Sequence, residues 1–386
     1  MDYQDTPRET AWRKEVRDFL ASEGPEEYRV HRRFPVDSGG RGDETYRAWR
    51  DAVADQGWLA AHWPTKYGGA GFSVMEQFIM KEEFGLSRCP HPGGRAVEMV
   101  GPTLILHGSD EQRSELLPPI LAGEHVYCQG FSEPSAGSDL ASLQLRATRD
   151  GDEYVLNGQK IWTSSAGTCN WIFFLARTDP DAPKHRGISY FVMPMDTPGI
   201  SVRPIPDMAG GKDLHETFFE DARVPAAYRV GEENRGWYVA MTTLDFERSG
   251  IAGAVALKMR ILDIAELVQP FEGPARLLLA DLFLSSEVAR QMSYQVAGIQ
   301  DRGLVPNHES SMVKLFSSEL TRRVDTAAVS FFGLRGQLYK DSLGYEANEG
   351  RIARSLSASI PAIIAGGSSE IQRGIIATRG LGLPRG

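Results

Sequence analysis

The sequence has few cysteines, no long hydrophobic run and no excess of positive charge. Its 386 residues include three cysteines, Cys89, Cys128 and Cys169, which are scattered and form no Cys-x-x-Cys pair. This argues against a disulfide framework or a zinc cluster and fits a reducing cytosol. No apolar stretch approaches the ~20 residues of a membrane span, and the charged N-terminus lacks the apolar core of a signal peptide. We therefore expect a cytoplasmic protein without a membrane span.

Basic surface, metal-ligand patterns and several enzyme signatures are also missing. The chain has 42 Lys and Arg against 51 Asp and Glu, a net charge of −9, which argues against a nucleic-acid partner. Its eight histidines form no His-x-x-x-His or His-Glu-x-x-His pattern, so no metal site is expected. No Gly-x-Ser-x-Gly motif of a hydrolase and no Gly-x-Gly-x-x-Gly nicotinamide fingerprint is found. These absences leave other enzyme classes open.

The order of local patterns is helices, then strands, then helices. Residues 1–126 are mostly typical of helices, with one apolar face formed by Trp12, Val16, Phe19 and Leu20. The next zone, 127–237, has strand-like runs separated by turn signals, at 143–149, 154–156, 160–163, 171–177 and 188–193. Its Asn157-Gly158 pair predicts a hairpin turn between two of these runs. Residues 238–386 are typical of helices again. The sequence thus predicts an α+β protein with an N-terminal helical domain, a middle β-barrel-like domain and a C-terminal helical domain.

Three segments hold side chains suited to chemistry. Residues 131–139 offer hydroxyl and backbone donors beside Gly137, which permits a close approach to a ligand, although their composition alone is more typical of a surface turn. Residues 160–164 place Trp162 beside hydroxyls, which suits stacking on an aromatic cofactor, although a tryptophan in such a strand is by itself more typical of the core. The tail, residues 363–373, predicts a glycine turn into a helix that Ser369 and Gln372 cap as a capping box.

Glu247 is the most informative carboxylate. Leu244, Ile251 and Ala254 are spaced so that Glu247 falls with them on one apolar helical stripe. A carboxylate on such a stripe is partly desolvated, which makes it a stronger base. A glutamate that ends a helix and pairs with a basic residue remains the alternative.

Together these segments resemble the acyl-CoA dehydrogenase family. The resemblance covers nearly the whole chain and rests on the order and spacing of motifs: Trp63-Pro64, Tyr67-Gly68-Gly69, Gly108-Ser109-Asp110-Glu111-Gln112, Ser132-Glu133-Pro134, Ser138-Asp139, Asn157-Gly158-Gln159-Lys160, Val224-Pro225 and Ser369-Glu370-Ile371-Gln372-Arg373. It implies that the C-terminal domain is a four-helix bundle. It also implies that FAD is the cofactor and an acyl-CoA thioester the substrate. In such enzymes a carboxylate abstracts the α-proton, flavin N5 takes the β-hydride, and the product is the trans-2-enoyl thioester.

The resemblance also implies roles for individual residues. The flavin and pyrophosphate contacts are matched by Phe131, Ser132, Gly137 and Ser138, and Ser138 also faces the acyl-CoA. Residues that pack on the flavin ring or bond near N5 are matched by Trp162 and Ser164. Positions that contact the CoA portion are matched by Asp245 and Arg248, and positions where the C-terminal helix approaches the FAD by Ser368 and Glu370.

The catalytic base cannot occupy the position in this sequence that it has in many family members. These members carry the catalytic glutamate at the position that is Gly366 here. A subgroup that includes isovaleryl-type enzymes places the base on a bundle helix instead, and Glu247 matches that position. We therefore expect Glu247 to be the catalytic base.

Two motifs that homotetrameric members lend to a neighbour's FAD are missing. The region of the Arg-x-x-Phe-Gly segment, residues 266–277, is short and contains Pro270, Gly273 and Pro274. The Gln-x-Phe-Gly-Gly-x-Gly motif becomes Ser-Phe-Phe-Gly-Leu-Arg-Gly at 330–336. This pattern resembles the heteromeric α2β2 acyl-CoA dehydrogenases of actinobacteria, often of steroid side-chain pathways, in which a sister subunit supplies the missing residues. A homo-oligomer in which substitutes such as Arg276 hold the FAD is the alternative.

The resemblance further implies electron-transfer flavoprotein as the electron acceptor. An acyl-CoA oxidase, in which the reduced flavin reacts with oxygen, is a rival within the same fold. A subunit that is inactive without its partner is a rival from another class. The acyl chain, and whether CoA or an acyl carrier protein bears it, are left open by the sequence.

Overall fold

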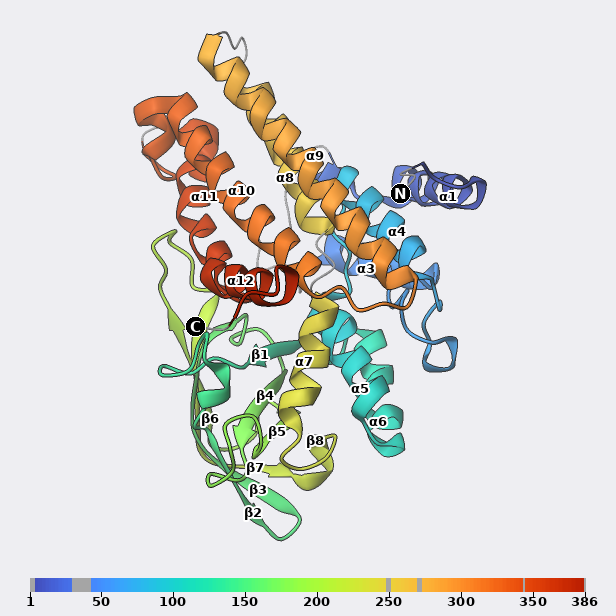
Figure 1. Cartoon of the computed structure of the whole chain (residues 1–386), viewed down its shortest axis with the longest axis vertical. Coiled ribbons are helices and arrows are strands. Elements are labelled where there is room, and N and C mark those ends of the chain that lie inside the picture. The colour runs from blue at the N-terminus through green and yellow to red at the C-terminus, as the bar shows by residue number, and fades with distance from the viewer. Residues whose placement is uncertain (1–3, 30–42, 248–250, 269–272, 343, 385–386) are drawn as a thin grey trace. The chain divides into compact units, whose positions relative to one another are not determined.

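The computed structural model of the chain describes residues 4–29, 43–247, 251–268, 273–342 and 344–384 (Figure 1). These residues form two compact units, each assembled from separate stretches of chain. The helical unit lies within Met1–Val53, Phe72–Pro92 and Arg248–Gly386, and the sheet unit within Ala54–Gly71 and Gly93–Glu247. The predicted α+β class is confirmed, with helical regions at both ends of the chain and a sheet in the middle.

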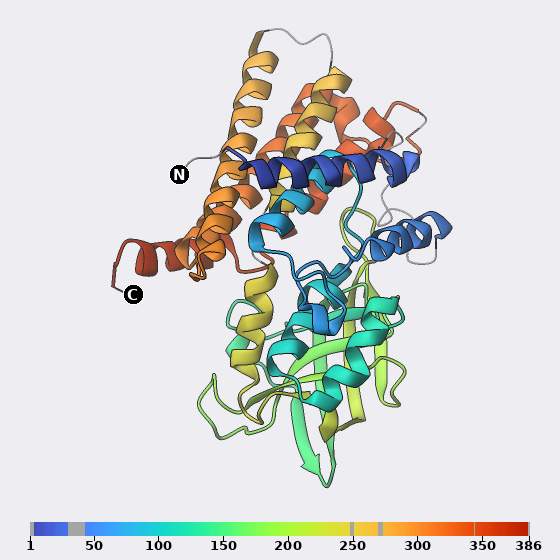
Figure 2. The same cartoon turned by 90° about the vertical axis from the view of Figure 1, so that its right-hand side faces the viewer.

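The helical unit is built around three long helices. α8 (Ile251–Val268), α9 (Gly273–Asp301) and α10 (His308–Phe332) lie side by side in both views (Figures 1 and 2). Their facing apolar side chains, including Leu257, Leu282 and Val324, are buried in one cluster. The other helices of this unit are α1 (Pro7–Glu23), α2 (Glu26–Arg29), α4 (Val74–Leu86), α11 (Arg351–Ser359), α12 (Ser369–Ile375) and most of α3 (Glu44–Asp55).

A buried network of charges joins α1, α4 and α9 within the helical unit. Arg13 Nη1 donates to Glu82 Oε2 at 2.6 Å and to Glu83 Oε1 at 2.7 Å. The Tyr294 hydroxyl donates to Glu82 Oε2 at 2.7 Å, and Arg290 also pairs with Glu82. Burial opposes the charge of Glu82, but these donors outweigh it and hold the pKa of this carboxyl below its usual range. The N-terminal helices are thereby bound to α9 of the bundle.

The sheet unit contains an eight-stranded mixed sheet in the order β6-β7-β3-β2-β4-β5-β8, with β1 paired to β4. The pairs β1–β4 and β2–β4 are parallel, and the others are antiparallel. The strands are β1 (Tyr127–Gly130), β2 (Arg146–Asp150), β3 (Glu153–Ser164), β4 (Trp171–Arg177), β5 (Ile188–Pro194), β6 (Ile200–Ile205), β7 (Leu214–Pro225) and β8 (Arg229–Val230).

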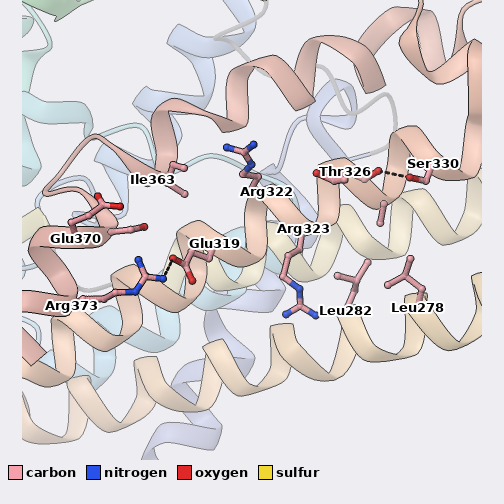
Figure 3. A pocket seen from close by; sticks show the side chains of 12 residues that line it. Leu278, Leu282, Glu319, Arg322, Arg323, Thr326, Ser330, Ile363, Glu370 and Arg373 are labelled. Atoms are coloured by element: carbon pink, nitrogen blue, oxygen red, sulfur yellow. Dashed lines mark hydrogen bonds and ion pairs between the residues drawn. The ribbon is translucent and has the colours of Figure 1, made fainter. Parts of the chain in front are cut away.

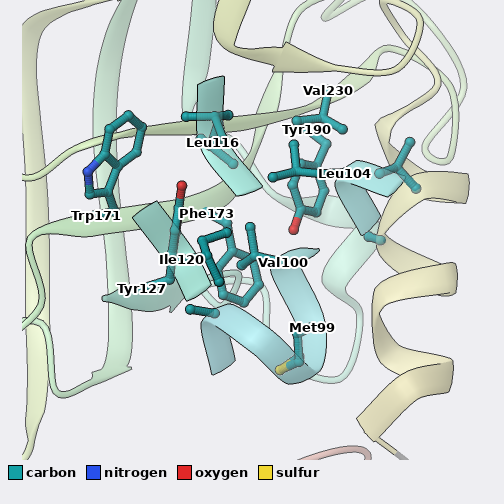
Figure 4. Close-up of a cluster of buried hydrophobic side chains, with 14 of the residues drawn as sticks. Met99, Val100, Leu104, Leu116, Ile120, Tyr127, Trp171, Phe173, Tyr190 and Val230 are labelled. Carbon is teal, nitrogen blue, oxygen red and sulfur yellow. The ribbon is translucent and has the colours of Figure 1, made fainter. Parts of the chain in front are cut away.

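The two strands β4 and β5 are buried on both faces. One face of β4, with Trp171 and Phe173, packs in a cluster with side chains of α5 (Gly101–His107), α6 (Asp110–Ala122) and α7 (Gly236–Glu247) (Figure 4). The opposite face, with Ile172 and Phe174, packs against β2, β3 and β7. Because neither face meets water, these strands need no polar alternation, which explains their continuous apolar sequences.

The hairpin predicted at Asn157-Gly158 is wrong. β3 continues through this pair and is paired with β7 on both sides of it, with a shift of register between Leu156 and Gly158. Gly158 has φ +143°, and a Cβ there would lie 3.0 Å from Leu145 Cα. Glycine therefore serves a bulge and a close backbone approach rather than a turn. The turn between β2 and β3 lies instead after Asp150, at Gly151.

Within the described ranges, no helix is long and apolar enough to cross a membrane. Nor do these ranges bring together three or more His, Cys, Asp or Glu side chains that could hold a metal ion. The three cysteines, all among the described residues, are buried and form no disulfide.

Candidate functional site

The loop that follows β1 is anchored by Phe131. Its ring is buried and packs edge-to-face on Phe173, with the ring centroids 5.6 Å apart. The backbone N–H of Ile161 donates to the Ser132 carbonyl at 2.9 Å, which joins the loop to β3. Glu133 and Ala136 exchange two backbone hydrogen bonds of 3.0 Å, which close a tight turn. Phe131 and Ser132 are thus held beside the strand that carries Trp162.

A buried ion pair fixes the same loop from within. Lys160 Nζ donates to Glu133 Oε1 at 2.7 Å and to the Phe131 carbonyl at 3.3 Å. Glu133 in turn accepts from the backbone N–H groups of Gln144, at 2.6 Å, and Leu145, at 2.9 Å. Burial lowers the pKa of Lys160 to about 8, against the attraction of Glu133. Lys160 therefore keeps its proton at pH 7.

Trp162 occupies an irregular point of β3. The register of β3 against β7 shifts between Lys160 and Thr163, and Trp162 there has φ +61°. An aromatic residue in this left-handed region is strained and is held there only by its surroundings. Its side chain is 55% exposed, although it is large and apolar. The bulge thus presents an indole to the outside of the sheet.

Two serines, Ser164 and Ser165, follow Trp162 in the chain. Ser164 follows on β3 and is half-buried opposite Leu214 of β7. Its neighbour Ser165 is bonded to Asp213 through both its backbone N–H, at 2.7 Å, and its hydroxyl, at 3.0 Å. Ser132 and Ser164 therefore lie on the two segments that meet at the bulge.

Gly137 and Ser138 lie on the open part of the loop. Both are exposed, and a Cβ at Gly137 would meet nothing within 4 Å. The carboxylate of Asp139 accepts from Lys184 Nζ at 2.6 Å and from the Ser142 hydroxyl at 2.5 Å, and these bonds lower the pKa of Asp139. Space is therefore available for a ligand next to Gly137 and Ser138.

Ser368 and Glu370 belong to the helical unit. Ser368 is the N-cap of α12 and accepts from the Ile371 N–H at 3.4 Å, so the capping box predicted for Ser369 and Gln372 is wrong. Gln372 instead donates to the Gly366 and Gly367 carbonyls. Hydrogen bonds from its own backbone N–H and from Ser368 lower the pKa of the exposed Glu370.

An open groove of about 560 Å³ lies beside α12 in the helical unit. Figure 3 shows Glu319, Arg322 and Arg323 of α10, Leu278 and Leu282 of α9, and Glu370 and Arg373 of α12 along it. Arg373 is paired with Glu319 at 2.5 Å, and Arg323 with Asp281 at 2.7 Å. Glu370 therefore borders a groove whose lining mixes leucines with paired charges.

The residues at the end of α7 are described only in part. α7 is described up to Glu247 and α8 from Ile251, so the predicted stripe of Leu244, Glu247 and Ile251 crosses residues 248–250, which lie outside the described ranges. Arg248 lies outside the described residues, and so do the side chains of Asp245 and Glu247. Their roles stay predictions.

The chain matches the three domains of one family along almost its whole length. Residues 6–124 match the acyl-CoA dehydrogenase N-terminal domain, 128–222 the middle domain and 234–381 the C-terminal domain. The chain therefore belongs to the acyl-CoA dehydrogenase family, whose members are flavoprotein oxidoreductases.

Individual relatives and solved structures agree with this membership. Acyl-CoA dehydrogenase FadE26 of Mycobacterium tuberculosis is 35% identical over 98% of both chains. The ChsE4–ChsE5 complex from Mycobacterium tuberculosis has a chain that is 34% identical, with a TM-score of 0.84 and full coverage of both chains. The Tcur3481–Tcur3483 steroid acyl-CoA dehydrogenase has a chain that is 32% identical, with a TM-score of 0.86, again over the full length of both.

Sequence reasoning missed the residues that organise the site. Glu133 and Lys160 stand inside the motifs, but only the structure shows that their buried ion pair joins the loop, β3 and the segment before β2. The sequence of β3 carried no clear signal for this burial, because Lys160 stands among other polar residues such as Asn157 and Gln159. Arg177, which binds carbonyls of two loops, was likewise not singled out.

Proposed function

We propose that this chain, with FAD bound, dehydrogenates an acyl-CoA thioester to the trans-2-enoyl thioester, and that Glu247 is the base. The observation that carries the proposal is the exposed indole of Trp162, held in strained backbone between segments rich in hydroxyl groups. Strained backbone of this kind clusters at ligand clamps and active sites, and an exposed indole offers a face on which a flat ligand can stack. Membership of the acyl-CoA dehydrogenase family indicates FAD as this ligand and dehydrogenation of an acyl-CoA as the reaction.

The residues of the sheet unit fit a flavin. Trp162 offers a flat apolar face, Ser132 and Ser164 offer hydroxyl groups near it, and Gly137 and Ser138 leave room for a pyrophosphate. We infer that these residues and Phe131 hold the FAD, with Ser368 and Glu370 contributing from α12. When bound, FAD supplies a planar acceptor for the β-hydride. The protein's part is to orient the thioester against that plane and to exclude water from it.

Glu247 has the task of removing the α-proton, which is only weakly acidic. A carboxylate does this efficiently when it is fixed within hydrogen-bond reach of the proton. The support for Glu247 is that Gly366 leaves the common position without a carboxylate, while Glu247 matches the alternative position on a helix. Asp245 and Arg248 are proposed to contact the CoA portion, and backbone or hydroxyl donors to stabilise the enolate oxygen.

The test is the isosteric change Glu247→Gln. We expect the variant to bind FAD normally but to reduce it with acyl-CoA about 10²- to 10⁴-fold more slowly, the usual contribution of a general base. The measurement is anaerobic bleaching of the flavin absorbance, together with exchange of the α-proton into D₂O. Glu220→Gln, an exposed change on β7, is the control. Bleaching of the Glu247→Gln flavin at the wild-type rate would overturn the assignment.

The electron acceptor is tested by oxygen uptake. We propose electron-transfer flavoprotein, and therefore expect negligible steady-state oxygen consumption during turnover of acyl-CoA. Rapid consumption with formation of hydrogen peroxide would make the protein an acyl-CoA oxidase. Unchanged activity of an assembled Glu247→Gln complex would instead indicate a subunit whose partner does the chemistry.

We further propose that the partner is a sister subunit of the same fold. Each region of a missing motif contains a leucine that the single chain leaves exposed: Leu277 of α9 is 75% exposed, and Leu334, after α10, is 83% exposed. Contact with another subunit would remove these side chains from water. The two solved structures named above are themselves pairs of different proteins, which supports a heteromeric assembly over a homo-oligomer.

A further inference from the structure

Two buried threonines join α5 to α7 within the sheet unit. The hydroxyl oxygens of Thr103 and Thr243 are 2.8 Å apart, and neither residue has any exposed surface. Each hydroxyl also has an acceptor one turn back along the chain, the Met99 carbonyl at 2.8 Å for Thr103 and the Val239 carbonyl at 3.0 Å for Thr243. One hydroxyl therefore donates to its carbonyl and accepts from the other, which donates across the two helices.

The surroundings of this pair are apolar. Val100, Leu104 and Val239, close to the threonines along the chain, are buried in the cluster that packs on β4 and β5 (Figure 4). A buried hydroxyl without a partner is costly in such a place. Turning α7 about its axis, or sliding it by one residue, would part the two hydroxyls and leave them among apolar side chains. The pair therefore selects one register of α7 against α5.

A second hydrogen bond between α5 and α7 lies beside the first. His107 Nε2 is 3.1 Å from the hydroxyl oxygen of Thr242, which itself donates to the Tyr238 carbonyl at 3.2 Å. Burial lowers the pKa of His107, so its ring is neutral at pH 7, and Nε2 is the nitrogen that donates. Because His107 and Thr103 lie one turn apart, one face of α5 holds two successive residues of α7.

Both hydrogen bonds lie about one turn before the proposed base. Thr243 precedes Glu247 by four residues, and α7 includes them both. Leu244, which follows Thr243, packs against the same apolar cluster. Residues of one helix turn together, because its backbone hydrogen bonds fix the angle between successive residues. A rotation of α7 at Thr243 would therefore carry Glu247 with it.

We propose that Thr103 and Thr243 are positioning residues, whose hydrogen bond sets the rotation of α7 and thereby aims Glu247 at the α-proton of the substrate, an inference that rests on the proposed function. A general base works only within hydrogen-bond reach of the proton that it removes, so the helix that carries it must be closely fixed. Because both threonines are fully buried, neither contacts the substrate. Their effect belongs to the chemical step and not to binding.

The test is Thr243→Val in the FAD-loaded protein with any subunit that it requires. This change keeps the shape of the side chain and removes its hydroxyl. With the acyl-CoA that bleaches the wild-type flavin fastest, we expect anaerobic bleaching and exchange of the α-proton into D₂O to slow about 10- to 100-fold, as for a small misplacement of a reacting group. The Kd for acyl-CoA, from the concentration dependence of bleaching, and the flavin content should stay unchanged. Thr243→Ser, which keeps a hydroxyl, should restore most of the rate.

The matched control is Thr321→Val. The Thr321 hydroxyl of α10 donates to the Ser317 carbonyl at 2.9 Å, one turn back in its own helix, and the structure shows it bonded to no other described helix. Its loss should leave the rates unchanged. Thr103→Val breaks the same bond as Thr243→Val from the side of α5, and the double valine variant should be no slower than either single variant. Thr243→Val/Glu247→Gln should be no slower than Glu247→Gln, because Thr243 acts through Glu247.

Other results would overturn the inference. Wild-type rates in Thr243→Val, or in Thr103→Val where the first variant does not fold, would leave the pair with a role in stability alone. Weaker binding at an unchanged bleaching rate would place the effect in binding, and further slowing of Glu247→Gln by Thr243→Val would show that the threonine does not act through this base. If Glu247→Gln itself keeps the wild-type rate, the proposed function loses its base, and the positioning role falls with it.

Discussion

Lys160 and Glu133 are charged side chains in an apolar part of the sheet unit, and Lys160 has no exposed surface. Removing one member of a buried pair leaves the other charge without compensation, which is strongly destabilising. We expect Lys160→Met to lower the free energy of unfolding by about 3–5 kcal/mol and to reduce the bound flavin. Urea unfolding and the flavin absorbance measure the two effects.

The double variant Lys160→Met/Glu133→Gln provides the matched comparison. It removes both charges, while the carbonyl oxygen of the introduced glutamine still accepts from one of the two backbone donors. Its loss of unfolding free energy should therefore be well below the sum of the losses of the two single variants. Additive losses would show that the two side chains are not coupled, and this would remove the proposed role of the pair in holding the loop.

Asp325 is a fully buried carboxyl of α10 with an ion pair, Oδ1 to Arg260 Nη2 at 2.5 Å. Burial raises its pKa to about 6, although Arg260 opposes the shift. The folded state thus binds this proton more tightly than the unfolded state, and the contribution of Asp325 to stability falls as pH rises from about 4 to 6. Asp325→Asn should therefore gain stability relative to wild type over this range, by roughly 2–3 kcal/mol.

Urea unfolding of both proteins between pH 4 and 7 measures this difference. Asp281→Asn is the control, because Asp281 is an exposed carboxylate of the neighbouring helix α9. A difference between wild type and Asp325→Asn that does not vary with pH would contradict the prediction.

At this scale the sequence predicted residue types better than contacts. In the structure, Ser132 and the β3 segment of Trp162 meet through the Ile161 N–H, a contact that the sequence did not predict. Neither the left-handed backbone of Trp162 nor the contact of Lys160 with Glu133, 27 residues away, follows from local pattern. Such features depend on the tertiary fold, which overrides local preference. The roles of Glu247 and of the cofactor-contacting residues stay predictions.

β3 shows how an element can mislead. Asn-Gly between apolar runs is a strong signal for a hairpin, yet β3 passes through it because β7 supplies pairing along its whole length. The strands β4 and β5 were predicted almost to the residue, since continuous apolar runs bounded by turns leave few alternatives. β6 and β7 were not predicted; the sequence signal for β7 is confined to its end, where Ala222 and Val224 alternate with the charged Asp221 and Arg223.

Gly158 offers a test of that strand. Gly158→Ala would place a Cβ 3.0 Å from Leu145 Cα, at a φ of +143° that other residues avoid. We expect a loss of about 2–4 kcal/mol in unfolding free energy, because the new Cβ would crowd Leu145 and the backbone would be strained at this φ. Gly151→Ala, at the true turn, also has a positive φ but meets nothing within 4 Å, so it should cost only about 1–2 kcal/mol. Equal losses would contradict the close approach.

For the whole molecule, the order of helices, strands and helices was enough to predict the fold class. The grouping of α1 and α4 with the C-terminal helices was not predictable, because it depends on contacts such as that of Glu82 with Arg290, which lie 208 residues apart in the chain. The proposed domains, 1–126, 127–237 and 238–386, rest on the local helix and strand patterns of the sequence and remain a prediction. The boundaries of the two compact units fall at other residues, because these units are defined by contacts in space.

Assembly is the property to measure first. If a sister subunit completes the flavin site, the chain purified alone should contain little flavin, seen as weak absorbance at about 450 nm. Co-expression with the sister subunit should restore the absorbance and give a larger mass in solution. Stoichiometric FAD in an assembly of this chain alone would overturn the heteromeric proposal.

The exposure of Trp162 gives the protein a built-in optical reporter. Of the seven tryptophans, all within the described residues, Trp162 alone is largely exposed, while Trp49, Trp58, Trp63 and Trp171 are buried. A collisional quencher such as acrylamide reaches an exposed indole much faster than a buried one. The quenchable part of the fluorescence thus comes mainly from the bulge of β3. A molecule that covers this ring should therefore lower the fraction of the tryptophan fluorescence that acrylamide can quench.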